Sequence, residues 1–293
     1  MDTLAAELVV DITNDTGECP IWSPFIKKLI WTDIPSGKLF TYDPISGEHC
    51  CIYEGRQVGG FTLQTDGSLV LCRDKGNVVV WKDGEELKTV VEAVPAMHET
   101  RFNDVIATPG GSIITGTIST DELAGQLYQV FSDGSYKVLL DGQGTPNGMA
   151  FSKDLKHMFY QDSRKNTLYR FDYDVNTDEL SNCTVVINQF ETDYPGRGDG
   201  LCMDEQDQLF SARYGGSAVL KENTSGIANL EIQVPDCANV TCCNFGGESM
   251  TDLYITSAGG SNRVEHGVLS GSLFKVSLAG QGYKGKQEFT TNF

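Results

Sequence analysis

The fold of this chain is decided by the stretch LIWTDIPSGKLFTYDP, residues 29–44, because its pattern returns along the whole sequence. Each copy has a short run rich in Val, Ile, Thr, Phe and Tyr, a polar turn containing Gly or Asn, and a second such run. This composition is typical of β-strands, and helical signals are nearly absent. The other copies are LVLCRDKGNVVVWKDG (69–84), IITGTISTDELAGQLYQVFSDG (113–134), MFYQDSRKNTLYRFDYD (158–174), LFSARYGGSAVLKENTSG (209–226) and LYITSAGGSNRVEHGVLSGSLFKVSLAG (253–280).

The spacing of the copies is close to the ~40–50 residues of a β-propeller blade. Solenoid repeats of that length are helical, and these copies are not. The copies also follow one another without a linker. We therefore predict an all-β, six-bladed β-propeller with a central channel, formed by a single domain spanning residues 1–293.

Equivalent positions in different blades meet at the axis of a propeller, because the innermost strand of each blade lines the channel. The position about ten residues before the second strand of each blade is occupied by Glu18, Gly60, Asn103, Asn147, Asp199 and the Thr241-Cys242 corner. Four of these positions carry oxygen-bearing side chains of the kind that bind hard cations. Such residues also cap turns at strand starts, but their recurrence in four repeats favours a site.

The composition limits the partners of the chain. Its 40 acidic and 22 basic residues give a net charge of −18, which argues against nucleic acid and anionic membranes and favours a bound cation. No apolar stretch approaches the ~20 residues of a membrane helix, and residues 1–10 lack the features of a signal peptide. The nine cysteines form no Cys-x-x-Cys pair, so we expect free thiols and a cytoplasmic location.

Short motifs at the axial positions resemble those of the senescence-marker-protein/gluconolactonase family, which includes regucalcin. The motifs are GECPIW (17–22), RFND (101–104), PNGMA (146–150) and GDG (198–200). The resemblance extends from Glu18 to the Gly271–Phe274 strand. Firefly luciferin-regenerating proteins and some bacterial lactonases are similar as well.

The resemblance implies functional residues as well as a fold. A divalent metal would be bound by Glu18, Asn147 and Asp199. Substrate would contact Arg101 and Asn103, with Asp121 as a further contact. Oxygen ligands favour Ca²⁺, with Mg²⁺, Mn²⁺ and Zn²⁺ as alternatives.

Two positions depart from the family pattern. Cys19 stands where the second glycine of Gly-Glu-Gly-Pro is usual, and its side chain would either crowd the channel or pack behind it. Gly198 stands where a proline is usual before the last ligand, and we expect the loss of proline to loosen the turn that presents Asp199.

Family likeness and metal chemistry together predict a metal-dependent hydrolase that opens sugar lactones such as gluconolactone to the free acid. A cation would stabilise the negative charge that develops on the carbonyl oxygen. We assign Asp199 as general base as well as ligand, and Arg101 as a donor to sugar hydroxyls or to the product carboxylate. We expect Asp104 to orient Asn103 or Arg101.

Two other functions fit the same pattern. One is a phosphotriester hydrolase, because the same metal centre can polarise a phosphoryl oxygen. The other is a non-enzymatic calcium-binding regulator or interaction scaffold. A serine hydrolase is disfavoured because no Gly-x-Ser-x-Gly motif occurs, and the four histidines lack the spacing of a zinc protease.

Overall fold

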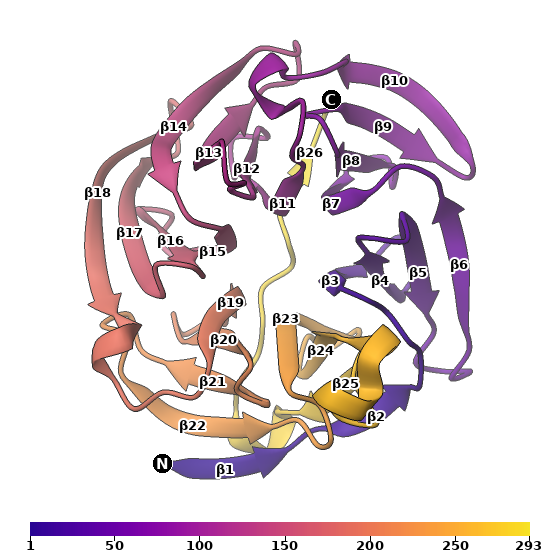
Figure 1. The fold of residues 1–293 in the computed structure, drawn as a ribbon, viewed down its shortest axis with the longest axis vertical. Helices are drawn as coiled ribbons and strands as arrows, with labels where there is room; N and C mark the ends of the chain where they lie inside the picture. Colours follow the sequence, from indigo (N-terminus) through magenta and orange to yellow (C-terminus); the bar gives the residue numbers. More distant parts are fainter.

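The computed structural model describes residues 1–293 and consists almost entirely of β-strands arranged radially around a central axis (Figure 1). The prediction of an all-β propeller is confirmed. Each group of strands is antiparallel and runs from the axis outward in sequence order. The innermost strands are β3 (Gly17–Ser23), β7 (Val58–Gln64), β11 (Phe102–Ala107), β15 (Pro146–Phe151), β19 (Arg197–Met203) and β23 (Asn239–Gly246).

The remaining strands of each group lie progressively further from the axis. The second strands are β4 (Lys28–Asp33), β8 (Leu69–Arg73), β12 (Ile113–Thr117), β16 (His157–Asp162), β20 (Leu209–Tyr214) and β24 (Asp252–Ala258). The third strands are β5 (Lys38–Tyr42), β9 (Val78–Lys82), β13 (Gly125–Val130), β17 (Thr167–Asp174), β21 (Ala218–Glu222) and β25 (Leu273–Ser277). The outer strands are β6 (His49–Glu54), β10 (Glu85–Val91), β14 (Tyr136–Gln143), β18 (Glu179–Asn188) and β22 (Ala228–Gln233), with β2 (Glu7–Val10) beside β25.

Hydrogen bonding divides these strands into five sheets instead of six separate ones. Three sheets have four strands, one has five and one has nine. The nine-stranded sheet contains two antiparallel runs, β19 to β22 and β23 to β25 with β2, and a single residue pair, Tyr214 with Asn239, joins them.

Both chain ends are built into the ring of strands. Near the N-terminus, β2 pairs with β25 of the last strand group, and β1 (Asp2–Ala5) pairs in parallel with β22 of the group before it. At the C-terminus, β26 (Thr290–Thr291) pairs in parallel with the innermost strand β7. The sequence analysis did not predict either closure.

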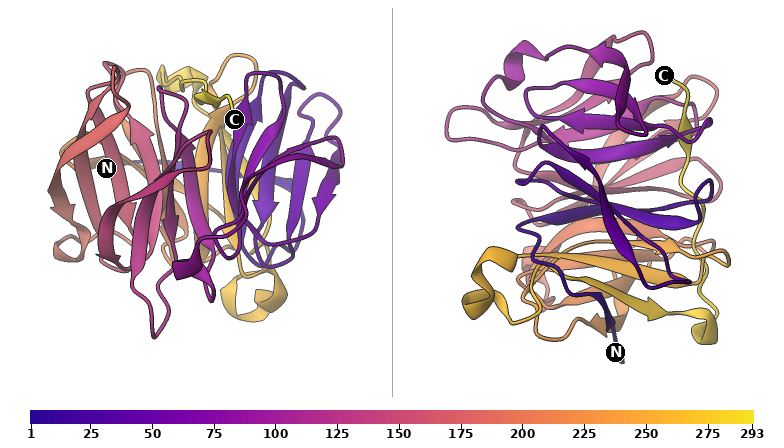
Figure 2. Two further views of the ribbon diagram at one scale, coloured as in Figure 1. Left: turned by 90° about the horizontal axis from the view of Figure 1, so that it is seen from above. Right: turned by 90° about the vertical axis from the view of Figure 1, so that its right-hand side faces the viewer.

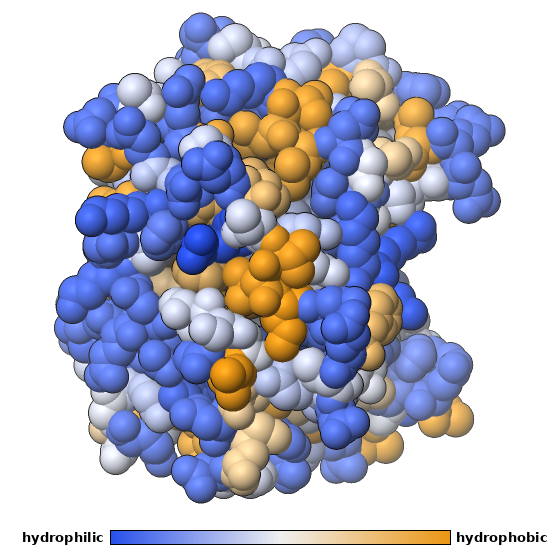
Figure 3. Space-filling view, turned by 90° about the vertical axis from the view of Figure 1, so that its left-hand side faces the viewer, coloured by the Kyte–Doolittle hydropathy of each residue, from blue (hydrophilic) through white to orange (hydrophobic).

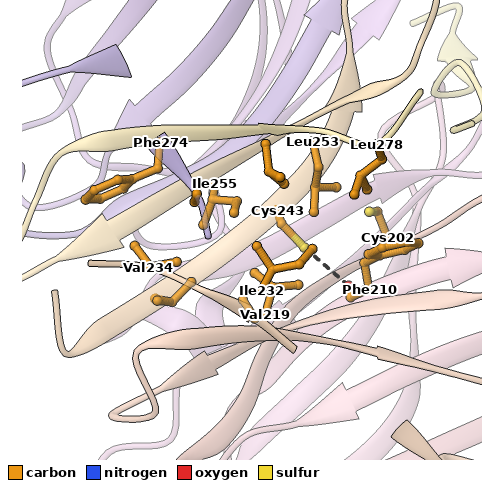
Figure 4. Close-up of a cluster of buried hydrophobic side chains, with 14 of the residues drawn as sticks. Cys202, Phe210, Val219, Ile232, Val234, Cys243, Leu253, Ile255, Phe274 and Leu278 are labelled. Carbon is orange, nitrogen blue, oxygen red and sulfur yellow. Dashed lines mark hydrogen bonds between the residues drawn. The ribbon is translucent and has the colours of Figure 1, made fainter. Parts of the chain in front are cut away.

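The core consists of six hydrophobic clusters. Each cluster combines side chains from two consecutive strand groups, so that buried apolar surface runs around the whole ring. The largest cluster joins the last two groups, and Figure 4 shows Phe210 and Ile232 facing Leu253 and Phe274. In it the Cys243 thiol donates to the Phe210 carbonyl at 3.3 Å.

Every innermost strand has an irregular register with its second strand close to the axial position found in the sequence. Such bulges redirect a side chain and are common beside active sites. In each group the start of the innermost strand pairs with the end of the second strand. The connections that follow the second strands therefore lie on the face where the innermost strands begin, which we call the entry face.

The helical segments are short and lie in the connections: η1 (Pro95–Met97), η2 (Gln189–Glu191), η3 (Gly260–Asn262), α1 (Arg263–His266) and η4 (Ala279–Gln281). Figure 2 shows α1, in the β24–β25 connection, and the yellow C-terminal tail at opposite faces of the ring. No helix has the length and apolar character needed to cross a membrane. The side in Figure 3 is mainly hydrophilic, with separate small apolar patches.

Candidate functional site

Three predicted ligands come from three different strand groups and meet near the axis. Glu18 is the second residue of β3, Asn147 the second of β15 and Asp199 the third of β19. Their side chains are 6%, 4% and 6% exposed, respectively. The structure therefore brings together the residues that the repeat positions selected.

Asn147 and Asp199 are in direct contact. The Asn147 amide nitrogen donates to Asp199 Oδ1 and, at 3.1 Å, to the hydroxyl of Ser163. The Asn147 amide oxygen is buried and has no hydrogen-bond partner. An unpaired buried acceptor on an amide that contacts the Asp199 carboxylate is suited to a cation.

The carboxyl groups of Glu18 and Asp199 are held in an unfavourable environment for negative charge. Burial is the main cause that raises the pKa of Glu18, and the charges of Asp199 and Asp104 raise it further. Burial and the charge of Asp104 raise the pKa of Asp199 in the same way. A cation among these groups would lower both pKa values and favour the ionised form of both carboxyl groups.

The donor set therefore fits a hard divalent cation. It has two carboxylates and one free amide oxygen, and protein calcium sites complete such sets with further oxygens, including water. Nowhere in the chain do three or more His, Cys, Asp or Glu side chains gather in a metal-binding arrangement.

Arg101 and Asn103 form a linked pair beside these ligands. Arg101 Nη1 donates to Asn103 Oδ1 at 2.9 Å and to the Phe102 carbonyl at 2.8 Å. The Asn103 amide nitrogen donates to the Pro146 carbonyl at 2.9 Å, so both polar atoms of Asn103 are engaged within the protein. Asn103 thus connects β11 to β15 and holds Arg101 in place.

Arg101 also borders a polar depression of about 370 Å³ on the entry face, with a lining that includes Lys75, His98, Thr100 and Thr120. Burial lowers the pKa of Arg101 to about 10, and the charges of Glu18 and Asp199 oppose that shift. The guanidinium therefore remains charged at neutral pH and is available to a polar ligand in the depression.

Asp121 lies further out than the other predicted residues. It is exposed in the β12–β13 connection on the entry face and makes no side-chain hydrogen bond in the structure. Its neighbour Thr120 lines the depression, whereas Asp121 does not. The structure thus places Asp121 on the entry face but not within the group of axial side chains.

Asp104 has a different role from the one expected. Its carboxylate accepts from the Val105 backbone at 2.8 Å and makes no bond to Asn103 or Arg101. Instead it borders a small axial cavity of about 30 Å³, together with Cys19 and Glu288. The expectation was wrong because β11 alternates its side chains, so that Asp104 points away from its neighbour Asn103. Burial raises the pKa of Asp104 to about 7.

Ser163 is a site residue that the sequence analysis missed. It follows β16 on the entry face, and its hydroxyl contacts both Asn147 and, at 3.4 Å, Asp199. The polar turn Ser163 to Asn166 was visible in the sequence as a turn between two strands. Its proximity to two ligands depends on how neighbouring strand groups pack, which the turn does not reveal.

The two departures from the family motifs have structural explanations. Cys19 has a φ of 52°, in the left-handed region that glycine adopts without strain, and its side chain packs in the core at 4% exposure. Gly198 leaves no space for a side chain, because a Cβ would lie 2.5 Å from Gln161. Its N–H donates to Asn166 at 2.9 Å, so this turn is held in place and the expected loosening is not seen.

Comparison with known proteins identifies the family to which this chain belongs. Residues 16–259 match the model of the SMP-30/Gluconolactonase/LRE-like region. The chain is 36% identical to pentonolactonase XacC of Haloferax volcanii, over 94% of each chain, and 29% identical to regucalcin of Danio rerio, over 88% of each. The solved structure of a luciferin-regenerating enzyme has a TM-score of 0.88 at 26% identity, over 99% of each chain. Fold, axial residues and matched sequence agree that this chain belongs to the SMP-30/gluconolactonase/LRE-like family.

Proposed function

We propose that this protein is a metal-dependent lactonase that opens sugar-type lactones to the free acid. The observation that carries the proposal is the convergence of Glu18, Asn147 and Asp199 beside a polar depression that Arg101 borders. The names of the relatives pentonolactonase and 6-deoxy-6-sulfogluconolactonase, the latter 30% identical over 83% of this chain, support the same reaction.

Glu18, Asn147 and Asp199 would hold the cation. When bound, a divalent cation supplies positive charge to a lactone carbonyl and lowers the pKa of water. Ca²⁺ fits this all-oxygen donor set best, with Mg²⁺, Mn²⁺ and Zn²⁺ as alternatives. The relatives named regucalcin, and a solved structure described as a calcium-binding protein, support a divalent cation in this family.

The remaining steps belong to the side chains. Asp199 accepts the proton of the attacking water as the water oxygen bonds to the carbonyl carbon. The ring C–O bond then breaks, and the released ring oxygen takes up the proton, which gives a hydroxy acid. Arg101 binds substrate hydroxyls in the depression and pairs with the product carboxylate. Asn103 keeps Arg101 oriented, and Asp121 contacts only those parts of a substrate that extend outward.

The fold and location carry two further proposals. We infer that the nine-stranded sheet is two blades and that the propeller has six, because six hydrophobic clusters each lie between consecutive strand groups. We also propose a cytoplasmic location for the single-domain protein, which the nine free cysteines support.

A pH-indicator assay on a panel of aldonolactones tests the function. We expect acid release that stops with a chelator and returns when Ca²⁺ is restored. Asp199→Asn should lower kcat by about 10²-fold or more if Asp199 is the base. The control is Thr184→Val, which removes a hydroxyl from the outer strand β18 and should leave the rate unchanged.

The outcomes separate the candidate functions. Full activity of metal-loaded Asp199→Asn would exclude the assignment of Asp199 as base. Absence of turnover of every lactone, alongside tight calcium binding, would instead indicate a calcium-binding regulator.

A further inference from the structure

One position of each second strand has a distinctive relation to the axial site. In the three groups that carry the proposed ligands it pairs with the residue just before the axial residue, and these pairs are Asp33 with Gly17, Asp162 with Pro146 and Arg213 with Gly198. All three side chains are buried, at 6%, 0% and 0% exposure. Each makes hydrogen bonds to the backbone that leads into a ligand-bearing strand.

Asp33 holds the approach to Glu18. Its Oδ1 accepts from the backbone N–H of Thr16 at 2.9 Å. Thr16 lies two residues before Glu18 in the chain. The bond therefore fixes the backbone immediately ahead of the first ligand.

Asp162 holds the approach to Asn147 with both carboxylate oxygens. They accept from the N–H groups of Gly144 at 2.8 Å and Thr145 at 3.0 Å, and Thr145 lies two residues before Asn147. A third bond, from the N–H of Lys165 at 3.1 Å, fixes the turn that carries Ser163. One buried carboxylate thus orients two segments that meet at Asn147.

Arg213 holds the approach to Asp199, but it donates to backbone carbonyls where Asp33 and Asp162 accept from backbone N–H groups. Its Nε donates to the Pro195 carbonyl at 2.9 Å and its Nη2 to the Gly196 carbonyl at 3.3 Å. Its Nη1 donates to the side chain of Gln189 at 2.9 Å, in the same connection. These bonds hold in place the segment before Asp199, where Gly198 replaces the proline that is usual in the family.

The other three groups lack this arrangement. At the corresponding end of their second strands, Arg73 bonds to Asn77 and Glu86, Thr117 to the backbone of Gln126, and Ser257 to the carbonyl of Ser272. None of these bonds reaches the backbone ahead of an axial residue. Hydrogen bonding from a buried side chain to the backbone ahead of the axial residue is therefore found in the three groups that carry the proposed ligands.

We propose that Asp33, Asp162 and Arg213 are positioning residues that pre-organise the three metal ligands, a proposal that rests on the proposed metal site. Asp33 and Asp162 are acids because the backbone groups that they bind are N–H donors. The third residue is an arginine because the backbone groups that it binds are carbonyl acceptors. Side chains that orient metal ligands typically contribute about 10–100-fold to metal affinity. The assignment gives a function to buried polar residues that contact neither metal nor substrate.

Calcium titration of the full-length protein by calorimetry tests the proposal. Asp162→Ala and Arg213→Met should each raise the Kd for Ca²⁺ about 10–100-fold. The matched controls are Ser257→Ala and Arg73→Met, which remove a buried side chain at the corresponding end of the second strand in groups without a ligand. Melting temperatures should fall in both sets, but the Kd should rise only in the first. Arg213→Lys, which keeps the charge but loses the fork, should raise the Kd less, and it provides the measurement if Arg213→Met does not fold.

An unchanged Kd in the Asp162 and Arg213 variants would overturn the positioning role. An equal rise in the Arg73 and Ser257 controls would do the same, because it would reflect general loss of stability. A wild-type protein that binds no Ca²⁺, or binds it as tightly after Glu18→Gln, would overturn the proposed metal site itself and the positioning role with it.

Discussion

Glu222 has an unusual environment for a single residue. It is 1% exposed on β21, and neither of its carboxylate oxygens has a hydrogen-bond partner. Burial raises its pKa from the ordinary 4.5 to about 7, and the nearby charge of Arg213 opposes that shift only in part. The folded protein therefore binds more protons than the unfolded chain between these two values, and the stability present at low pH is lost as the pH rises through this window.

We expect Glu222→Gln to stabilise the protein at pH 8 by about 1–3 kcal/mol, because it removes a buried charge. The difference from wild type should disappear near pH 4, where Glu222 is protonated in both states. Urea unfolding of both proteins at pH 8 and pH 4 measures this difference in the free energy of unfolding. Glu179→Gln, at an exposed position of β18, is the control and should change the free energy of unfolding by less than about 0.5 kcal/mol. A destabilised Glu222→Gln at pH 8 would show that the attraction between Glu222 and the nearby charge of Arg213 outweighs the cost of burying the carboxylate.

Individual site residues differ in how far the sequence predicted them. The repeat pattern predicted that Glu18, Asn147 and Asp199 lie together, because a repeat position also fixes a place on the axis, and the family resemblance singled them out as ligands. The left-handed backbone conformation of Cys19 was not predicted, although the glycine usual at this position in the family is the residue that adopts it without strain. Asp162 and Arg213 were missed because one shared position carries an acid in one repeat and a base in another, and only the hydrogen bonds show that their roles match.

At the scale of elements, β2 completes the last strand group from the opposite end of the chain. Its Leu8 pairs with Phe274 of β25, and its Val10 is 4% exposed in the cluster that joins the last group to the first. The sequence analysis identified six repeats but did not identify this strand. A four-residue strand followed by a polar segment has too little pattern to indicate its partner.

Deletion of residues 1–10 should therefore open the ring at its last strand group. We expect the melting temperature to fall by about 5 °C or more, since burial of Val10 alone contributes about 1.5–3 kcal/mol. Deletion of residues 1–5 is the matched control, because it removes only β1 from the outer edge of β22. Equal melting temperatures for the two truncated proteins, measured by differential scanning calorimetry, would contradict a closing role for β2.

At the scale of the whole molecule, the C-terminal tail crosses the face opposite the entry face and ties several strand groups together. Lys286 donates to the carbonyl of Phe151 at 2.7 Å, and Gln287 donates to the carbonyl of Trp22 at 3.1 Å. Glu288 accepts from Asn244 at 2.8 Å and borders the axial cavity. The yellow segment at the centre of Figure 1 is this tail, and it covers the far end of the axis.

Truncation after Gly285 should expose the axial cavity from that side. Cys19 and Cys242 line the cavity and are buried in the full-length protein. We expect iodoacetamide to label both thiols in the truncated protein, as measured by mass spectrometry, and to spare them in the full-length protein. Exposed Cys50 should be labelled in both proteins, and Cys72, which is buried away from the cavity, in neither. Protection of Cys19 and Cys242 after truncation would mean that the tail does not seal the axis.

A tail that closes one end of the axis also affects the movement of reactant and product. If the site opens lactones, a neutral molecule enters and an anion has to leave through the same opening on the entry face. The hydroxy acid therefore delays the next lactone for as long as it stays, so product inhibition should be competitive. The net charge of −18 favours its departure, because the field of the whole protein repels the anion that the reaction creates.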